Sequence, residues 1–356
     1  MAQGTPLKVW FVNVGHGDCT IVKFPSGRVM MVDICNSKTL DQDTRAELLK
    51  SAGWLDDNAR SRFAAYGLGN MPYTVAEEMR SYERLLDDPI DDVLKTDPEL
   101  QNRNIFRFVV THPDMDHMTG IYRLFQQEES IDVVNMWDTE NTKKQPKKTG
   151  KGYDERDWKE YQRAREQKTD PKVLFLYRGA TGEYYADDNI SILSPTTGLK
   201  DECNDAEDWN NVSQVLRITY GESALLLPGD TESKAQQEMG DYFGDQLQST
   251  ILKASHHGRD SGYHNDFVRA VSPEYTIVSV GKKENDASGK YRQHTRKKVF
   301  STRFMGTKYA ELFADGDVRI WNSPKKGKER IDEGANLAAA LARILLDQRG
   351  QTGLRI

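Results

Sequence analysis

The stretch "FVVTHPDMDHMTG", residues 108–120, decides how this chain can be interpreted. An apolar run ends abruptly and is followed within six positions by His112, Asp114, Asp116 and His117. A helix start would explain a capping aspartate and a proline in the first turn, but not both histidines. Taken alone, the stretch leaves a metal site and an ordinary helix start about equally open.

Three further apolar runs end in the same residue types. "MMVDI" ends at Asp33, "LLLPGD" at Asp230, and "ILKASHHG" at the adjacent pair His256 and His257. Each could be a turn residue or a solvated pair. Together they form a pattern, because the ends of neighbouring strands meet at one edge of a sheet. We therefore expect these side chains to share a site.

Composition narrows the class of protein. A chain of 356 residues has room for one large domain or two smaller ones. A net charge of -6 provides no general positive field for nucleic acid. Cys19, Cys35 and Cys203 are widely spaced and odd in number, which predicts a reducing compartment without disulfides. No signal-peptide pattern or membrane-length apolar run is visible, so we expect a cytoplasmic protein without a membrane segment.

Strand patterns occur in two successive sets, each accompanied by helical patterns, which predicts two sheets covered by helices in a four-layer αββα sandwich. We expect this domain to span residues 1–330, with a helical insertion at 36–104 and a charged insertion at 139–172. Residues 331–356 read as a C-terminal amphipathic helix. The segments 36–104 and 331–356 are candidate surfaces for a protein partner or a second copy of the chain.

The charged insertion begins with a group of lysines: Lys143, Lys144, Lys147, Lys148 and Lys151. They could follow a nucleic-acid backbone, or they could form a solvated loop, which is the commoner fate of such a run.

The motifs "HPDMDH", "PGD" and "SHHG", in that order, resemble those of the metallo-β-lactamase-fold hydrolases. Together with "NVGHGDCTIV", "NNVSQVLRITYGESALLLPGD" and "LKASHHG", they look like the ComEC branch, which comprises the hydrolase domain of a DNA-uptake channel protein and its stand-alone relatives. The resemblance covers residues 7–35, 105–138 and 188–320 in pieces. It implies the metallo-β-lactamase fold.

The resemblance also implies a centre of two divalent ions, Zn²⁺ or Mn²⁺. It makes His112 and Asp114 ligands of a first ion, with Asp114 where relatives often have histidine. Ligands of the second ion would be Asp116, His117 and one histidine of the pair; His257 is favoured because it precedes Gly258. Asp230 would bridge the two ions.

One departure from the family pattern weakens the first ion site. Many relatives place another histidine between the two motif loops, but none lies between His117 and His256 here. Asn211 and Ser213 occupy that region, so water or substrate phosphate could complete the site.

Further residues are implied as supports or substrate contacts: Asp33, His16, His256, Asn211 and Ser213. Asp116 would orient the attacking water, which makes it catalytic. His294 stands where relatives carry a Gly-His-Pro turn; it could protonate a leaving oxygen or be an exposed loop histidine.

The resulting hypothesis is a metal-dependent hydrolase of phosphodiesters, with DNA or RNA as the favoured substrate. Metal-bound water supplies hydroxide near neutral pH, and two ions can hold the attacking and leaving oxygens. A phosphodiesterase for small nucleotides or phosphocholine-type esters remains an alternative, and a lactonase or thioesterase is a weaker one. An effector subunit of a bacterial defence complex is also open, by analogy of fold alone.

Overall fold

The computed structural model describes residues 4–36, 45, 73–145, 153–279, 286–322 and 331. The expected C-terminal helix, apart from residue 331, lies outside the described residues. So do Lys147, Lys148 and Lys151 and much of the insertion at 36–104. The described part of that insertion contains an α-helix and a π-helical turn, α3 (Tyr73–Glu83) and η2 (Pro89–Leu94).

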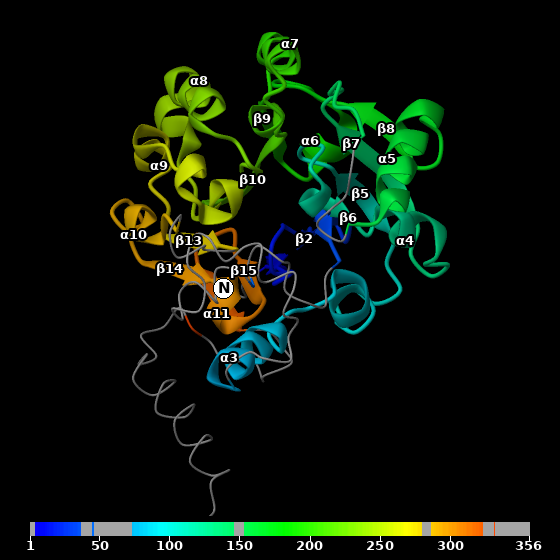
Figure 1. The fold of residues 1–356 in the computed structure, drawn as a ribbon. Helices are drawn as coiled ribbons and strands as arrows, with labels where there is room; N and C mark the ends of the chain where they lie inside the picture. The colour runs from blue at the N-terminus through cyan, green and yellow to red at the C-terminus, as the bar shows by residue number, and fades with distance from the viewer. Residues whose placement is uncertain are drawn as a thin grey trace, which may run out of the picture.

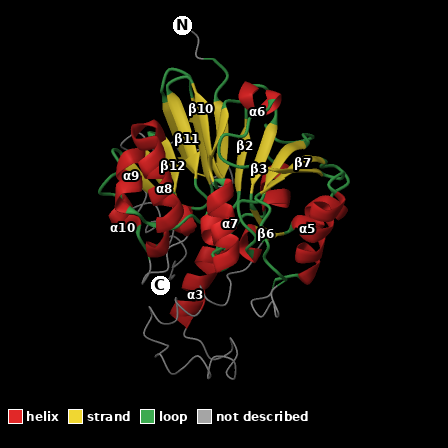
Figure 2. Cartoon of the chain, turned by 90° about the horizontal axis from the view of Figure 1, so that it is seen from above, coloured by secondary structure: helices red, strands yellow, loops and turns green. Residues whose placement is uncertain are grey.

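Two sheets form the centre of the described fold (Figure 2). The first has eight strands in the order β16-β15-β1-β2-β3-β5-β7-β8. These strands are β1 (Leu7–Phe11), β2 (Thr20–Lys23), β3 (Val29–Val32), β5 (Ile105–Val109), β7 (Val133–Asp138), β8 (Lys172–Phe175), β15 (Lys308–Leu312) and β16 (Val318–Asn322). The second has six strands in the order β14-β13-β12-β11-β10-β9. They are β9 (Ile190–Ser194), β10 (Val215–Tyr220), β11 (Ser223–Leu227), β12 (Ile251–Lys253), β13 (Tyr275–Val278) and β14 (Lys298–Ser301). A small pair, β4 (Ile34–Cys35) and β6 (Met118–Thr119), lies beside the first sheet's loops.

Alternation along the strands explains why two sheets pack face to face. In β1, Leu7, Val9 and Phe11 enter a core shared with Leu225 and Ile277 of the second sheet. The intervening Trp10 faces a different core, beneath helices. A strand with apolar groups on both faces must be covered on both sides, so β1 lies in the interior of a layered structure.

Helices form the outer two layers. The first sheet is covered by α4 (Ile121–Gln126) and α5 (Glu155–Gln167), whose Ile121, Trp158 and Tyr161 enter its outer core. The second sheet is covered by α8 (Ser233–Phe243), α9 (Asn265–Val271) and α10 (Ser288–Tyr291), through Met239, Phe267 and neighbouring side chains. Three short helices complete the described set: α6 (Glu183–Asp187), α7 (Thr197–Ala206) and α11 (Thr302–Met305). Figure 1 shows the two helical groups on opposite sides of the molecule.

The expected four-layer αββα sandwich is confirmed. Two details differ from the strand pattern in the sequence. Residues 172–175 directly precede the strands of the second sheet in sequence, but β8 pairs with β7 at the edge of the first sheet. Strand β14 was not predicted. Its sequence "KVFS" has one fully buried residue, Phe300, which stacks against Tyr275.

The topology places the metal-capable residues at one edge. β3 and β5 are parallel neighbours, and so are β11 and β12. β1 runs in the same direction as β3, because both are antiparallel to β2. Within each sheet the loops after these strands therefore open at the same edge, and the contacts of Asp230 with His117 and His257 bring the two edges together. No helix in the described part of the chain is long and apolar enough to span a membrane.

Candidate metal centre

The loop after β5 carries two imidazoles, those of His112 and His117, whose Nε2 atoms are available to bind a metal ion. Asp33 accepts hydrogen bonds from Thr111 N (2.8 Å) and Thr111 Oγ1 (2.7 Å), and it lies 2.7 Å from His117 Nδ1. The Nδ1 of His112 lies 3.2 Å from Thr111 Oγ1. With Nδ1 occupied in both rings, Nε2 is the nitrogen directed into the site.

The loop after β12 brings two adjacent histidines to the same point. His256 and His257 both adopt left-handed backbone angles, with φ of 47° and 62°. Such angles are costly for residues with a Cβ and cluster at functional sites. In an extended strand, neighbouring side chains would point to opposite faces. Gly258 follows with φ of 96°, and a Cβ there would lie 2.8 Å from Val278 Cγ1, so only glycine fits.

Asp230, after β11, is the centre on which these histidines converge. Its Oδ2 lies 3.2 Å from His117 Nε2 and 3.3 Å from His257 Nε2. His256 and His112 approach it less closely, with Nε2 at 3.7 Å and 3.9 Å. Asp230 N donates to Ser213 Oγ (3.1 Å), so the predicted Ser213 holds the backbone of the aspartate.

The buried groups of this cluster fit a metal ion. Among the described residues, the Nε2 atoms of His112, His117 and His257, the Nδ1 of His257 and the Oδ1 of Asp230 are buried without a hydrogen-bond partner. Orphaned buried polar atoms are costly, and a cation held by several of them removes the cost. The ligand atoms fall into three overlapping groups, each within 4.8 Å: His112, His117 and Asp230; Asp116, His117 and His257; Asp230, His256 and His257.

The ionisation of the clustered side chains shows how strongly they interact. Burial opposes ionisation of Asp230, yet His117, His257 and His256 outweigh burial and hold its pKa well below the ordinary value. Burial also disfavours protonated His117, but Asp230 and Asp33 raise the pKa of that imidazole well above its usual range. The pKa of His257 rises to about 9 in spite of burial, because Asp230 and Asp18 face it. For His112 burial prevails, and its pKa is lowered.

Two buried charged residues, Asp18 and Lys253, lie behind His257. Asp18 Oδ1 lies 3.5 Å from His257 Nδ1, while its Oδ2 accepts a hydrogen bond from Lys253 Nζ (2.7 Å). The ammonium of Lys253 also donates to Ser279 Oγ (2.9 Å). A lysine inside an otherwise apolar strand was the available signal, since a buried charge needs a partner.

His256 has an equivalent support, which the sequence did not indicate. Its Nδ1 lies 3.0 Å from Glu232 Oε1 and 2.8 Å from Ser261 Oγ. The predicted Asn211 acts one step further out, because its Oδ1 accepts from the backbone N–H groups of Glu232 (3.0 Å) and Ala235 (3.1 Å). Asn211 therefore fixes the start of α8 and the position of Glu232. His256 can serve as a ligand as well as a substrate contact.

The remaining predicted residues form the open side of the cluster. Asp114 Oδ2 lies 4.0 Å from His112 Nε2, and its Oδ1 pairs with Lys143 Nζ. Asp114 belongs to none of the three ligand groups found among the described residues. Asp116 Oδ2 lies 3.3 Å from both His257 Nε2 and His16 Nε2.

His294, the second candidate catalytic residue, contacts the start of α9. Its Nε2 is 2.8 Å from Asn265 Oδ1, at the beginning of α9. Among the described residues no hydrogen bond or ion pair joins His294 to the cluster.

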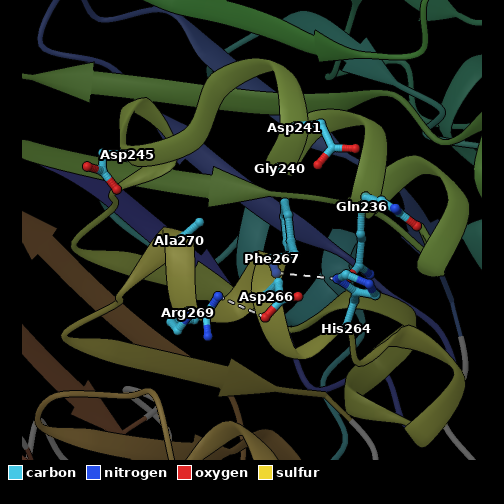
Figure 3. A pocket seen from close by; sticks show the side chains of 10 residues that line it. Gln236, Gly240, Asp241, Asp245, His264, Asp266, Phe267, Arg269 and Ala270 are labelled. Atoms are coloured by element: carbon cyan, nitrogen blue, oxygen red, sulfur yellow. Dashed lines mark hydrogen bonds and ion pairs between the residues drawn. The ribbon is translucent and has the colours of Figure 1, made fainter.

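A hollow of about 440 Å³ between α8 and α9 is separate from this centre (Figure 3). Its carboxylates Asp241, Asp245 and Asp266 are exposed. Arg269 pairs with Asp266 at 3.0 Å, and His264 accepts from the backbone N–H of Phe267 at 3.4 Å. Both contacts lie within α9 and its N-terminal cap. The described residues that line the hollow form no group of side chains close enough to bind a metal ion together.

The fold and the cluster define the chain as a four-layer α/β sandwich with a candidate metal centre at one edge. No protein-family model matches the chain. A segment of 74 residues is 39% identical to the Competence protein ComA of Neisseria gonorrhoeae and covers 21% of this chain and 11% of that protein. A segment of 84 residues is 32% identical to ComE operon protein 3 of Bacillus subtilis and covers 24% of this chain and 11% of that protein. The chain thus matches about a tenth of the length of these curated relatives.

Solved structures show a broad but distant likeness. A mutant of the CmlA beta-hydroxylase aligns over 86% of this chain and 54% of its own, with 12% identity and a TM-score of 0.44. CmlA from Streptomyces venezuelae, a diiron beta-hydroxylase, aligns over 82% of this chain and 49% of its own, with 13% identity and a TM-score of 0.38.

Proposed function

We propose that this chain is a metal-dependent hydrolase of phosphodiesters, with DNA or RNA as substrate. The observation that carries the proposal is the convergence of buried, unpartnered imidazole nitrogens on Asp230. Divalent ions held there would supply an activated water as nucleophile and neutralise charge on the phosphoryl oxygens. A donor set of imidazoles and carboxylates suits Zn²⁺ and also the harder Mn²⁺.

The chain's own residues divide the remaining work between them. Asp33, 2.7 Å from Nδ1 of His117, holds that ring so that its Nε2 points into the site, and Asp18 faces Nδ1 of His257 at 3.5 Å. Asp116 lies on the open side. Burial opposes its ionisation, but His16 and His257 outweigh this and hold the pKa of Asp116 well below the ordinary value. An aspartate that stays ionised accepts a hydrogen bond from water and orients it, rather than keeping a proton of its own.

Basic groups flank the cluster on two sides, which favours an anionic substrate. Lys143 forms an ion pair with Asp114, and Arg259 Nη2 lies 2.9 Å from His16 Nδ1. A phosphodiester carries one negative charge, and cations placed around it would stabilise the charge that develops during displacement. Among phosphodiesters, the resemblance of the motifs to the hydrolase domain of a DNA-uptake channel protein favours a nucleic acid.

The experiment combines metal analysis with a substrate panel. The purified chain is analysed for bound metal by mass spectrometry, stripped with chelator and reloaded with Zn²⁺ or Mn²⁺. It is then assayed on single- and double-stranded DNA, RNA, a cyclic dinucleotide and bis(4-nitrophenyl) phosphate. We expect metal in the purified protein, loss of hydrolysis on chelation, and recovery on reloading.

The panel also separates the alternatives. Hydrolysis of the cyclic dinucleotide and the dye, without cleavage of any polymer, would move the substrate to small nucleotides. A metal-loaded chain inactive on every phosphodiester would contradict the proposal.

A further inference from the structure

Lys143 is distinct from the other lysines of the charged insertion that the structure describes. Its side chain is 18% exposed, and its ammonium pairs with the Oδ1 of Asp114 at the open side of the metal cluster. Lys144, the next residue, is exposed. The structure therefore distinguishes Lys143 from Lys144, the other lysine of the run that it describes.

A buried polar network fixes the backbone that carries Lys143. Asn141 donates from Nδ2 to Tyr161 Oη (2.7 Å), and Tyr161 Oη donates to Asp138 Oδ1 (2.9 Å). The carbonyl of Asn141 accepts from Arg165 Nη2 (2.7 Å), and Arg165 Nε pairs with Asp138 Oδ2 at 2.6 Å. Strand β7 and helix α5 thereby hold this loop from both sides.

The network reaches Lys143 and its neighbour directly. The backbone N–H of Lys143 donates to Asn141 Oδ1 (3.3 Å), and that of Thr142 donates to Asn204 Oδ1 on α7 (3.1 Å). Buried groups that satisfy one another in this way rigidify a segment. The position of Lys143 is therefore a built feature of the fold, unlike that of a side chain in a solvated loop.

The chemistry of the ammonium group indicates what it does there. An ammonium has three N–H donors, of which Asp114 can engage one, so donors remain for an anion. Asp114 is 34% exposed, against 3% for Asp230, so the pair stands where substrate arrives. Lysine binds phosphate as a point charge.

We propose that Lys143 is a substrate-binding residue that holds a non-bridging oxygen of the phosphodiester at the Asp114 side of the centre. This inference rests on the proposed function. It makes the charged insertion part of the active site, through one lysine in a fixed position. Asp114 then serves to place the ammonium, in addition to or in place of binding an ion.

The experiment compares Lys143→Gln with Lys143→Arg and with the neighbouring control Lys144→Gln, all in the full chain. Each variant is checked for thermal unfolding and metal content. Inorganic phosphate is then titrated into the metal-loaded proteins, and KM and kcat are measured with bis(4-nitrophenyl) phosphate. For Lys143→Gln we expect the affinity for phosphate to fall and KM to rise, each by about tenfold to a hundredfold, as for loss of a charged hydrogen bond. Metal content should be unchanged. Lys143→Arg should recover most of the phosphate affinity, and Lys144→Gln should behave as wild type.

The outcomes separate this inference from the proposed function. Equal effects of Lys143→Gln and Lys144→Gln, or no phosphate binding by the wild type, would overturn the inference. A variant Lys143→Gln that binds metal more tightly but phosphate unchanged would also overturn it, because the lysine would then merely compete with metal for Asp114. If the wild type cleaves no phosphodiester yet binds phosphate through Lys143, the proposed function fails and the binding role stands.

Discussion

The inner and outer halves of the metal cluster differ in how their charges are satisfied. The inner half, defined by His117, His257 and Asp230, is almost fully buried, and each histidine faces a carboxylate behind it. The outer half, defined by Asp114 and Lys143, is partly exposed and is neutralised by its own ion pair. Buried groups without partners need a cation, whereas an exposed ion pair does not. The comparison favours metal binding by the inner half and, on our proposal for Lys143, substrate binding by the outer half.

The strongest test of this division replaces one aspartate in each half. Asp230→Asn removes the charge on which the imidazoles converge, so we expect the metal to be lost and hydrolysis to fall by more than about a hundredfold. Asp114→Asn should leave most of the metal bound. Metal content by mass spectrometry measures both, and Asp241→Asn, on the exposed face of α8, is the matched control. Equal metal loss in the two variants would erase the distinction between the halves.

A smaller effect is expected from the carboxylates behind the histidines. Asp33→Asn keeps the shape of the side chain but removes the acceptor charge at His117 Nδ1. Loss of such a support weakens metal affinity by about tenfold to a hundredfold. Competition with a chromogenic chelator measures the affinity. If Asp33→Asn binds metal as tightly as wild type, orientation by the inner carboxylates is not what prepares the site.

The pH dependence of metal binding follows from the raised pKa values. Asp230 and Asp33 raise the pKa of His117 well above its ordinary value, and the pKa of His257 rises to about 9, so a proton on each ring competes with a metal ion. Each proton must leave before Nε2 can bind an ion. Affinity should therefore rise with pH, by up to about tenfold per unit for each displaced proton, and level off above the pKa values. Calorimetry in two buffers of different ionisation enthalpy counts the released protons; binding without proton release would contradict the ionisation described here.

The smallest effect is expected at His294, which the sequence resemblance made catalytic. Its contact with Asn265 places it at the start of α9, without an ion pair or hydrogen bond to the described cluster. His294→Ala should change kcat/KM by less than about twofold, as for a surface substitution. A large fall in kcat with metal retained would return His294 to the active site and would show that the loop closes over bound substrate.

Short stretches of sequence were enough to predict the main outline of the fold, because the positions and ends of strands are encoded by neighbouring residues. The alternation of β1 and the apolar runs before Asp33, Asp230 and His256 identify strands and their ends. β14 escaped prediction because only one of its four residues is fully buried. The membership of β8 in the first sheet depends on pairing with β7, which no short pattern encodes.

What the sequence alone determined is the set of chemical groups at the strand ends and the layered fold that gathers them. Tertiary structure decided which atoms meet. Left-handed angles at His256 and His257 turn both Nε2 atoms toward Asp230, and Lys253 reaches Asp18 across 235 positions of sequence. The physical reason is that side-chain direction depends on a few loop dihedrals, and a buried charge is satisfied by whichever partner the packing brings close. Lys143 illustrates the same rule, because nothing in a run of lysines shows which one a buried network will hold against Asp114.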